Sequence, residues 1–334
     1  MAVKVAINGF GRIGRLVGRI ALQREDVEIV AVNGLGDIKT SSHLFRYDSV
    51  HGEFKGQVAI DGEYLLLNGQ KIRYLSEKDP RQLPWKEMGA EVVVEASGAF
   101  RTREKAAQHL QAGAKKVVIT APGKGVELTM VMGVNHEQYR PEYDVVSNAS
   151  CTTNCLATVA KVLLDEFGIN KGLINTVHSY TNDQRVIDLE HDDLRRARAA
   201  GLSMIPTTTG AASALGLVLP ELEGKLDGLA VRVPTPDVSL LDFTLELEKP
   251  ATAEAINQAF KAASEGYLKG YLRYEEEPLV SIDYRGDEHS AIVDGPLTMV
   301  MGDRLAKVIA WYDNEWGYSA RVVDMVSYLA AKGL

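Results

Sequence analysis

The sequence has only two cysteines, Cys151 and Cys155, among its 334 residues. They are too few for the disulfide framework of a small secreted domain, and their spacing is not that of a zinc or redox motif. We therefore expect a cytoplasmic protein with no metal site. The first nine residues favour the same location, because glycine interrupts the apolar run where the hydrophobic segment of a secretory signal would continue.

Excess positive charge and long apolar runs are also missing. There are 37 Lys and Arg residues against 45 Asp and Glu residues, a net charge of −8. Bulk binding to a phosphate backbone needs clustered positive charge, so we expect no nucleic acid as the main partner. No stretch approaches the roughly 18 apolar residues that a membrane helix needs, so we expect no membrane partner either.

The length predicts two domains, at roughly 100–200 residues for each. Residues 1–150 alternate β-branched runs, such as 3–7, 28–32, 92–94 and 117–120, with helical patterns, one of them around 104–110. Alternation of this kind is typical of an α/β domain with a parallel sheet covered on both faces. We interpret residues 1–150 as one domain of this α/β class.

Residues 151–314 have a different pattern. Polar and apolar residues alternate over 242–248, which predicts a half-exposed antiparallel strand. Further strands are predicted at 279–284, 290–293, 297–301 and 306–312, and helices at 153–167 and 253–265. This is an α+β catalytic domain with a mostly antiparallel sheet. The C-terminal segment 315–334 contains a last helix with one apolar face, and we expect it to dock back on the first domain.

A glycine-rich turn, G-x-G-x-x-G, joins the first predicted strand to the first helix. Gly9 permits the tight turn, Gly11 lets the backbone approach a pyrophosphate, and Gly14 lets the helix pack on the strand. The phosphates would lie at the helix N-terminus, on free N–H groups and the positive end of the dipole. This context predicts dinucleotide binding, and we interpret residues 1–150 as a Rossmann dinucleotide-binding domain for NAD or NADP.

The acidic residue that usually follows the second strand is absent. Asn33 and Gly34 stand there, and the next acid is Asp37. A carboxylate at this place holds the ribose 2′-hydroxyl of NAD and would repel the 2′-phosphate of NADP. Its absence opens the site to NADP, unless the loop folds back so that Asp37 reaches the ribose.

Cys151 is the candidate nucleophile. It follows a strand and a small polar segment, and it lies at or near the N-terminus of an apolar-striped helix. The free N–H groups and dipole at a helix start lower the pKa of a thiol, so we expect a depressed pKa for Cys151. Cys155, one turn further along, is predicted to be a buried core thiol.

A cysteine nucleophile needs a base, and His178 is the best candidate. It ends the apolar run 173–177, which places it at the rim of a sheet. His191, beside two aspartates, is interpreted as a solvated loop residue.

Two further segments suit anions in this acidic protein. The basic stretch 195–198 leads to a turn of three threonines and Gly210, which is rich in hydroxyl and N–H donors, and Arg232 ends another predicted strand. The alternative is surface ion pairs for the arginines and plain β-propensity for the threonines. Together with Cys151 and His178, these segments favour a small phosphorylated substrate.

In these motifs the chain resembles the phosphorylating glyceraldehyde-3-phosphate dehydrogenases of the type I, bacterial-like group, and the resemblance covers essentially its whole length. The resemblance is carried by residues 7–14 (INGFGRIG), 147–154 (SNASCTTN), 178–184 (HSYTNDQ), 193–198 (DLRRAR), 232–235 (RVPT) and 311–318 (WYDNEWGY).

The resemblance implies a function and a role for each matching residue. Cys151 would attack D-glyceraldehyde 3-phosphate and His178 would act as base; reduction of NAD or NADP would leave a thioester, and inorganic phosphate would release 1,3-bisphosphoglycerate. The attacking phosphate matches Ser150, Thr152, Thr209 and Gly210, and the phosphate of the substrate matches Thr181, Arg196 and Arg232. The cofactor matches Gly9, Gly11, Arg12, Ile13, Gly14, Gly34, Lys78, Ser97, Gly98, Thr120, Asn314 and Tyr318. The family is homotetrameric, with 181–201 as an interface loop.

Two departures from the NAD-specific pattern bear on the cofactor. Gly34 stands where such members have aspartate, and Glu190 stands where they have proline in the interface loop. Lys78 adds a basic residue on the adenosine side, whereas Glu190 adds an acid and no arginine follows Gly34. The balance favours NADP or dual use over NAD alone.

Two alternatives are weaker. An erythrose-4-phosphate dehydrogenase would share Cys151 and His178, but its members typically lose Thr181 and the threonine loop, which are intact here. A non-catalytic NAD(P)-binding scaffold need not keep the nucleophile, the base and every anion ligand together.

Overall fold

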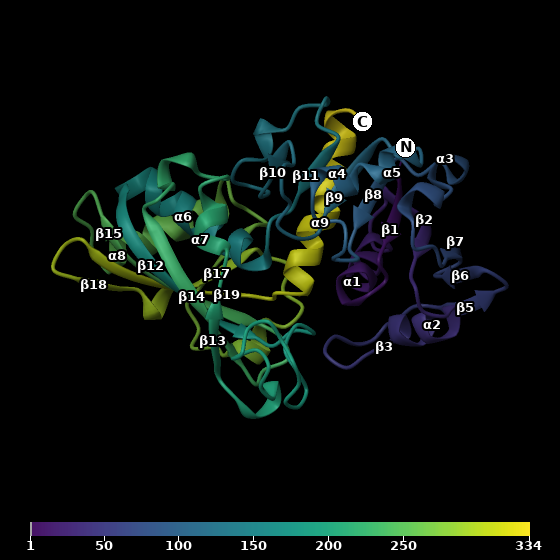
Figure 1. The fold of residues 1–334 in the computed structure, drawn as a ribbon. Helices are drawn as coiled ribbons and strands as arrows, with labels where there is room; N and C mark the ends of the chain where they lie inside the picture. Colours follow the sequence, from purple (N-terminus) through teal and green to yellow (C-terminus); the bar gives the residue numbers. More distant parts are fainter. Residues whose placement is uncertain (1) are drawn as a thin grey trace. The chain divides into compact units, whose positions relative to one another are not determined.

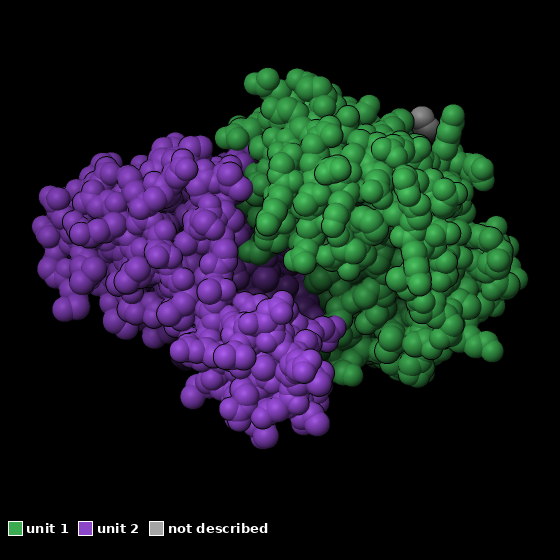
Figure 2. All heavy atoms as spheres, viewed as in Figure 1, with its two compact units in different colours: residues 1–132, 136–150, 319–334 green, residues 133–135, 151–318 purple. Residues whose placement is uncertain are grey.

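The computed structural model describes residues 2–334 and divides the chain into two compact units (Figures 1 and 2). Unit 1 comprises the residues up to Met132, His136–Ser150 and Ser319–Leu334. Unit 2 comprises Gly133–Asn135 and Cys151–Tyr318.

Unit 1 is built on a nine-stranded sheet in the order β10-β11-β9-β8-β1-β2-β7-β6-β5. The strands from β10 to β7 pair in parallel, and the hairpins β7-β6 and β6-β5 are antiparallel. The strand bounds are β1 Val3–Asn8, β2 Val27–Asn33, β5 Val58–Asp61, β6 Tyr64–Leu67, β7 Gln70–Leu75, β8 Val92–Glu95, β9 Lys116–Ile119, β10 Leu128–Thr129 and β11 Val145–Ser147. A separate ribbon pairs β3 Tyr47–Asp48 with β4 Gly52–Glu53.

The central strands of this sheet are mostly apolar, as expected for strands covered on both faces, with polar residues such as Asn8, Glu95 and Lys116 at their ends. Every residue of β8 and β9 is buried. The helices of unit 1 are α1 Arg12–Ala21, α2 Ile38–Arg46, α3 Trp85–Met88, α4 Arg103–Ala106 and α5 Gln108–Gln111, with 3-10 turns at Pro80–Gln82 and His136–Gln138. The helix predicted around 104–110 is therefore two short helices.

The last helix, α9 (Trp316–Lys332), begins in unit 2 and belongs to unit 1 from Ser319 onward. Asp324 of α9 forms an ion pair with Arg24 at 2.8 Å, and the ring of Tyr328 packs edge-on to His136. These contacts fix the helix within unit 1.

Unit 2 is built on a mixed sheet in the order β13-β14-β12-β15-β19-β17-β16, with β18 paired to β19. The pairs β12-β14 and β16-β17 are parallel, and the other pairs are antiparallel. The bounds are β12 Ile169–Ser179, β13 Ile205–Thr208, β14 Leu226–Val233, β15 Ser239–Leu247, β16 Leu272–Glu275, β17 Ala291–Asp294, β18 Met299–Met301 and β19 Leu305–Tyr312.

The helices of unit 2 are α6 Cys151–Phe167, α7 Ala211–Leu215 and α8 Ala253–Glu265, with 3-10 turns at Ala200–Leu202, Pro220–Leu222, Ser281–Tyr284 and Gly295–Leu297. The two units confirm the predicted fold class, a Rossmann domain with an α+β domain whose sheet is mostly antiparallel. No helix among residues 2–334 is long and apolar enough to cross a membrane.

Two predicted strands of unit 2 were wrong or too long. Residues 279–284 form no strand, because the Asp283 carboxylate accepts the N–H of Val280 at 2.9 Å and closes a 3-10 turn. Tyr284 is buried by stacking on Trp311, whereas Val280 and Ile282 are exposed, so the apolar residues do not share a strand face. In 297–301 only Met299–Met301 is a strand.

Candidate active site

Cys151 is the first residue of α6, at the point where the chain leaves β11. The turn into the helix passes through Ala149, whose φ of 54° lies in the left-handed region that non-glycine residues rarely adopt. Cys151 stays partly exposed, whereas Cys155 is buried, as predicted. The sharp turn therefore presents the first thiol at the helix start and leaves the second in the core.

His178 is the next-to-last residue of β12, and its Nε2 lies 3.5 Å from Cys151 Sγ. Its ring packs edge-on to Tyr312, whose hydroxyl is held by hydrogen bonds to Thr152 at 2.9 Å and Thr176 at 2.8 Å. The predicted nucleophile and base, 27 positions apart in the chain, are thus in contact within unit 2.

The register of the sheet brings a third group to this pair. In the parallel ladder β12-β14, His178 stands opposite Arg232. Arg232 Nη1 lies 2.7 Å from His178 Nδ1 and 3.0 Å from the carbonyl oxygen of Ser179. Residues that pair in a parallel ladder project from the same face, so this contact follows from the strand pairing.

The histidine has two arrangements available at Nδ1. A protonated Nδ1 donates to the Ser179 carbonyl at 2.7 Å, and an unprotonated Nδ1 accepts from Arg232. In the first arrangement the lone pair of Nε2 faces the thiol, as a general base requires.

The pKa values of both groups favour a neutral resting pair. Burial raises the pKa of the Cys151 thiol, and the charge of Arg232 and the hydrogen bonds of Thr152 only partly oppose this. The expected depression of the Cys151 pKa is therefore wrong: desolvation outweighs the helix start. Burial, with the charge of Arg232, lowers the pKa of His178 to about 3.

The predicted anion ligands of unit 2 are only partly brought together. Arg196 donates to Thr207 Oγ1 at 2.8 Å and forms an ion pair with Asp183 at 2.7 Å. Thr207 and Thr208 belong to β13, so the predicted threonine turn is a strand and only Thr209 and Gly210 lie beyond it. In the described residues, no hydrogen bond joins Thr181, Thr209 or Gly210 to the Cys151–His178 pair.

Other histidines and polar residues of unit 2 are placed as follows. His191 Nε2 lies 3.5 Å from an Asp183 carboxylate oxygen and is not a fully solvated loop residue. Ser239 Oγ accepts the N–H of Ser179 at 3.1 Å and donates to Asn314 Oδ1 at 2.7 Å, which ties Asn314 to the end of β12. Tyr318 is buried in α9.

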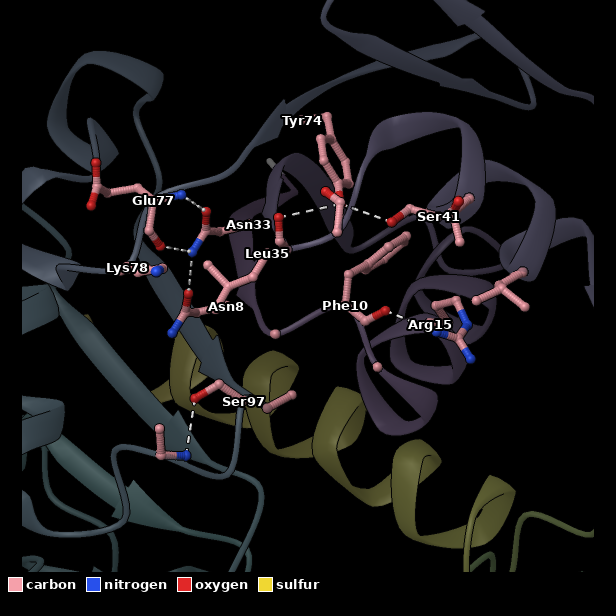
Figure 3. Close-up of a pocket in the computed structure, with 18 of the residues that line it drawn as sticks. Asn8, Phe10, Arg15, Asn33, Leu35, Ser41, Tyr74, Glu77, Lys78 and Ser97 are labelled. Atoms are coloured by element: carbon pink, nitrogen blue, oxygen red, sulfur yellow. Dashed lines mark hydrogen bonds between the residues drawn. The ribbon is translucent and has the colours of Figure 1, made fainter. Parts of the chain in front are cut away.

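Unit 1 holds a cavity of about 620 Å³ at the carboxyl ends of β1, β2 and β7. Five predicted cofactor residues line it, namely Gly9, Gly11, Gly34, Lys78 and Ser97, whereas Arg12, Ile13, Gly14, Gly98 and Thr120 do not. Figure 3 shows the cavity between the glycine turn and the loop that follows β2.

The glycines of the turn fit the dinucleotide pattern. Gly9 has φ 98°, and a Cβ there would stand 2.3 Å from the Ser97 nitrogen; a Cβ on Gly14 would stand 2.0 Å from the Gly9 carbonyl oxygen. A Cβ on Gly11 would meet nothing within 4 Å, so the cavity is open at this position. The turn therefore needs Gly9 and Gly14 for packing and offers Gly11 as the place where a ligand approaches the backbone.

Asp37 does not reach this cavity. Its carboxylate accepts the N–H of Thr40 at 2.9 Å and caps α2, so it is turned to the helix and is not among the residues that line the cavity. The acid that does line the cavity is Glu77, whose carboxylate accepts the N–H of Asp79 at 2.9 Å. Arg12 is held outside by an ion pair with Asp48 at 3.1 Å.

A buried polar network that sequence reasoning missed supports the cavity wall. Asn33 donates to Asn8 at 2.7 Å, and Asn8 donates to the Glu95 carboxylate at 2.6 Å (Figure 3 shows the first of these contacts). Trp85 Nε1–H donates to His109 Nδ1 at 3.0 Å, so Nδ1 is the acceptor and the proton of the ring is on Nε2. His109 Nε2 then donates to the Glu95 carboxylate at 2.9 Å. The sequence does place an asparagine at the end of each of two neighbouring strands, Asn8 and Asn33. Because the carboxyl ends of parallel strands meet at one sheet edge, this pattern could have predicted their contact.

Comparison with known proteins agrees with this geometry. Residues 3–103 match the family described as "Glyceraldehyde 3-phosphate dehydrogenase, NAD binding domain", and residues 150–314 match "Glyceraldehyde 3-phosphate dehydrogenase, C-terminal domain".

Full-length relatives are similar throughout. The chain is 59% identical to glyceraldehyde-3-phosphate dehydrogenase of Geobacillus stearothermophilus, over 100% of both chains. It is 56% identical to glyceraldehyde-3-phosphate dehydrogenase 2 of Bacillus subtilis (99% of this chain and 98% of the relative) and 54% identical to glyceraldehyde-3-phosphate dehydrogenase 2 of a Nostoc species (99% of both). With its cysteine–histidine pair and its glycine turn in the matching regions, the chain belongs to the glyceraldehyde-3-phosphate dehydrogenase family.

Proposed function

We propose that this protein is an NAD(P)-dependent phosphorylating aldehyde dehydrogenase that converts D-glyceraldehyde 3-phosphate and inorganic phosphate reversibly into 1,3-bisphosphoglycerate. The observation that carries the proposal is the contact of 3.5 Å between Cys151 Sγ and His178 Nε2 at the start of α6. The family membership supports the reaction class, and the pair supplies a nucleophile with its base.

The chemistry divides between sulfur and imidazole. His178 Nε2 takes the proton of the neutral Cys151 thiol as sulfur bonds to the aldehyde carbon, and passes it to the carbonyl oxygen, which gives a thiohemiacetal. A bound nicotinamide cofactor would supply the hydride acceptor for this adduct, and His178 would take the hydroxyl proton as the thioester forms. When a phosphate oxygen then attacks the carbonyl carbon, the carbon–sulfur bond breaks and the sulfur takes a proton back from His178, which restores the neutral thiol.

The nucleophile has to be a cysteine for the second half of this sequence. An oxygen nucleophile would give an ester, which is too stable to pass its acyl group readily to phosphate. The raised pKa of Cys151 makes the base necessary, because the thiol is protonated before the substrate arrives.

We propose anion roles for residues near this pair. Arg232, within 2.7 Å of His178, is suited to the phosphate of the substrate, together with Thr181 and with Arg196 once Arg196 leaves Asp183. Four residues are proposed for the attacking phosphate: Ser150, which directly precedes Cys151 in the chain, Thr152, Thr209 and Gly210.

For the cofactor we propose NADP or dual use. Gly34 lines the cavity where a carboxylate would repel a 2′-phosphate, and Asp37 is engaged in capping α2. The charged side chains of the lining are Arg15, Lys78 and Glu77, so the cavity carries an excess of one positive charge. This excess of positive charge favours the cofactor with the additional 2′-phosphate, NADP.

Initial rates test the reaction and the cofactor together. With D-glyceraldehyde 3-phosphate, we expect cofactor reduction that depends on inorganic phosphate, with NADP at least matching NAD. Cofactor reduction that does not depend on inorganic phosphate, or a higher kcat/KM with erythrose 4-phosphate than with D-glyceraldehyde 3-phosphate, would contradict the proposed reaction. A strong preference for NAD would contradict only the proposed cofactor choice.

We also propose that the chain acts as a homotetramer. Its loop 186–204 exposes large apolar side chains, including Val186 (89% exposed), Leu194 (83%) and Leu202 (87%), which is costly for a monomer in water. Light scattering should give about four times the chain mass of 36.5 kDa. The variant Leu202→Glu should reduce the measured mass. The control variant Glu221→Gln should not, because Glu221 is exposed and lies outside the loop. A parent protein that is monomeric would refute the proposed tetramer.

A further inference from the structure

The hydroxyl of Tyr74, near the end of β7, holds the loop that follows β2. Tyr74 Oη lies 2.7 Å from Ser41 Oγ, 2.9 Å from the Gly36 carbonyl oxygen and 3.3 Å from the Gly34 carbonyl oxygen. Tyr74 and Ser41 are both buried and both line the cavity (Figure 3). One side chain therefore joins the sheet, the loop and α2 at this end of the cavity.

The same hydroxyl occupies the space that a side chain at position 34 would need. A Cβ on Gly34 would stand 2.8 Å from Tyr74 Oη and 3.3 Å from Phe10 Cβ. The backbone of Gly34 is not in the left-handed region, so it would accept another residue without strain. The main obstacle is the oxygen of Tyr74 at 2.8 Å; Phe10 Cβ at 3.3 Å is a tight contact, and Cζ of Tyr74 at 3.5 Å is an ordinary one.

We propose that Tyr74 is a specificity-determining residue for the cofactor, through this exclusion between its hydroxyl and any side chain at position 34. The hydroxyl keeps position 34 free of a carboxylate, so the charged side chains that line the cavity remain Arg15, Lys78 and Glu77. The proposal rests on the proposed function only in taking the cavity as the cofactor site.

Neighbouring groups support this reading of the cavity end. Ser41 and Thr40 contribute hydroxyls from α2, and Glu77 has its carboxylate bonded to the Asp79 N–H. Asp37 is turned to Thr40 as a helix cap. The lining at this end therefore offers hydroxyl groups and the Lys78 ammonium, while its one carboxylate, Glu77, is already hydrogen-bonded to the Asp79 N–H, and this set favours a phosphate.

The test is a double-mutant cycle on the full-length protein, read by the Kd of NAD and of NADP from fluorescence titration without substrate. We expect Gly34→Asp alone to weaken both cofactors, because its side chain collides with Tyr74 Oη. We expect Tyr74→Phe combined with Gly34→Asp to restore NAD binding while NADP stays weak. The ratio of the two Kd values should then favour NAD by about 100-fold more than in the parent, well beyond the product of the two single changes.

Tyr64→Phe is the matched control, since Tyr64 lies on the adjacent strand β6 and does not line the cavity. It should leave both Kd values unchanged. Thermal unfolding of every variant separates a loss of folding from a loss of specificity.

Ser41→Ala provides a second test if Gly34→Asp does not fold. This variant removes the hydrogen-bond partner of the Tyr74 hydroxyl and should change the ratio of the Kd values of NAD and NADP.

Three results would overturn the inference. One is a full switch to NAD by Gly34→Asp with no further effect of Tyr74→Phe. The second is a double variant with the parental ratio of Kd values, and the third is an unchanged ratio in Ser41→Ala. A parent that binds neither cofactor would instead refute the proposed function itself, so the two failures are distinguishable.

Discussion

The variant Cys151→Ala is expected to lose at least about 1,000-fold in kcat with glyceraldehyde 3-phosphate, because no other atom in the site can form the thioester. Sulfur bonds to the aldehyde carbon in the first step and leaves in the last, so both half-reactions depend on it. Initial rates should fall to background with either cofactor, and the burst of cofactor reduction in the first turnover should vanish.

Cys155→Ala is the matched control for this loss. Cys155 lies one turn along the same helix and is fully buried. Its replacement leaves a small cavity that costs about 1 kcal/mol of stability and should leave the burst intact. Turnover that survives in Cys151→Ala, or that disappears in a folded Cys155→Ala, would contradict the assignment of the nucleophile.

The variant His178→Asn is expected to lower kcat by about 100- to 10,000-fold, the usual loss when a general base is removed. The reason is the neutral resting pair, since burial raises the pKa of the Cys151 thiol. Without a base, the thiol must lose its proton to solvent before it attacks. Stopped-flow measurement of the burst across pH 5 to 10 checks this expectation.

The pH profiles of parent and variant should differ in form. In His178→Asn the burst rate should rise about tenfold per pH unit until it nears the pKa of the thiol, because only the thiolate reacts. In the parent the pKa of His178, lowered to about 3, keeps the imidazole neutral over this range, so the burst rate should be nearly independent of pH. Parallel profiles for the two proteins would exclude His178 as the base.

The sequence allowed prediction of those parts of the site that depend on local pattern. A glycine turn between a strand and a helix predicts its own backbone geometry, and Gly9 and Gly14 are indeed positions where no Cβ fits. Cys151 at the start of α6 and His178 at the end of β12 were likewise readable from apolar runs and their boundaries.

The features of the site that could not be predicted from the sequence depend on packing between segments that are distant in the chain. The pKa of Cys151 is set by burial, which no motif reports, so the expected direction was wrong. Arg232 reaches His178 through the register of β12 on β14, and Tyr74 reaches Gly34 across β7 and β2. The predicted strand at 279–284 failed because a single aspartate closes a turn that its apolar pattern does not reveal.

The most direct test of the central claim is to trap the acyl-enzyme. The protein is incubated with glyceraldehyde 3-phosphate and the oxidised cofactor without phosphate, quenched in acid, and analysed by intact and peptide mass spectrometry. We expect a phosphoglyceroyl group on the peptide that carries Cys151, and its rapid loss when inorganic phosphate is added before the quench. An unmodified Cys151 in protein that reduces the cofactor, or an adduct that phosphate does not discharge, would contradict it.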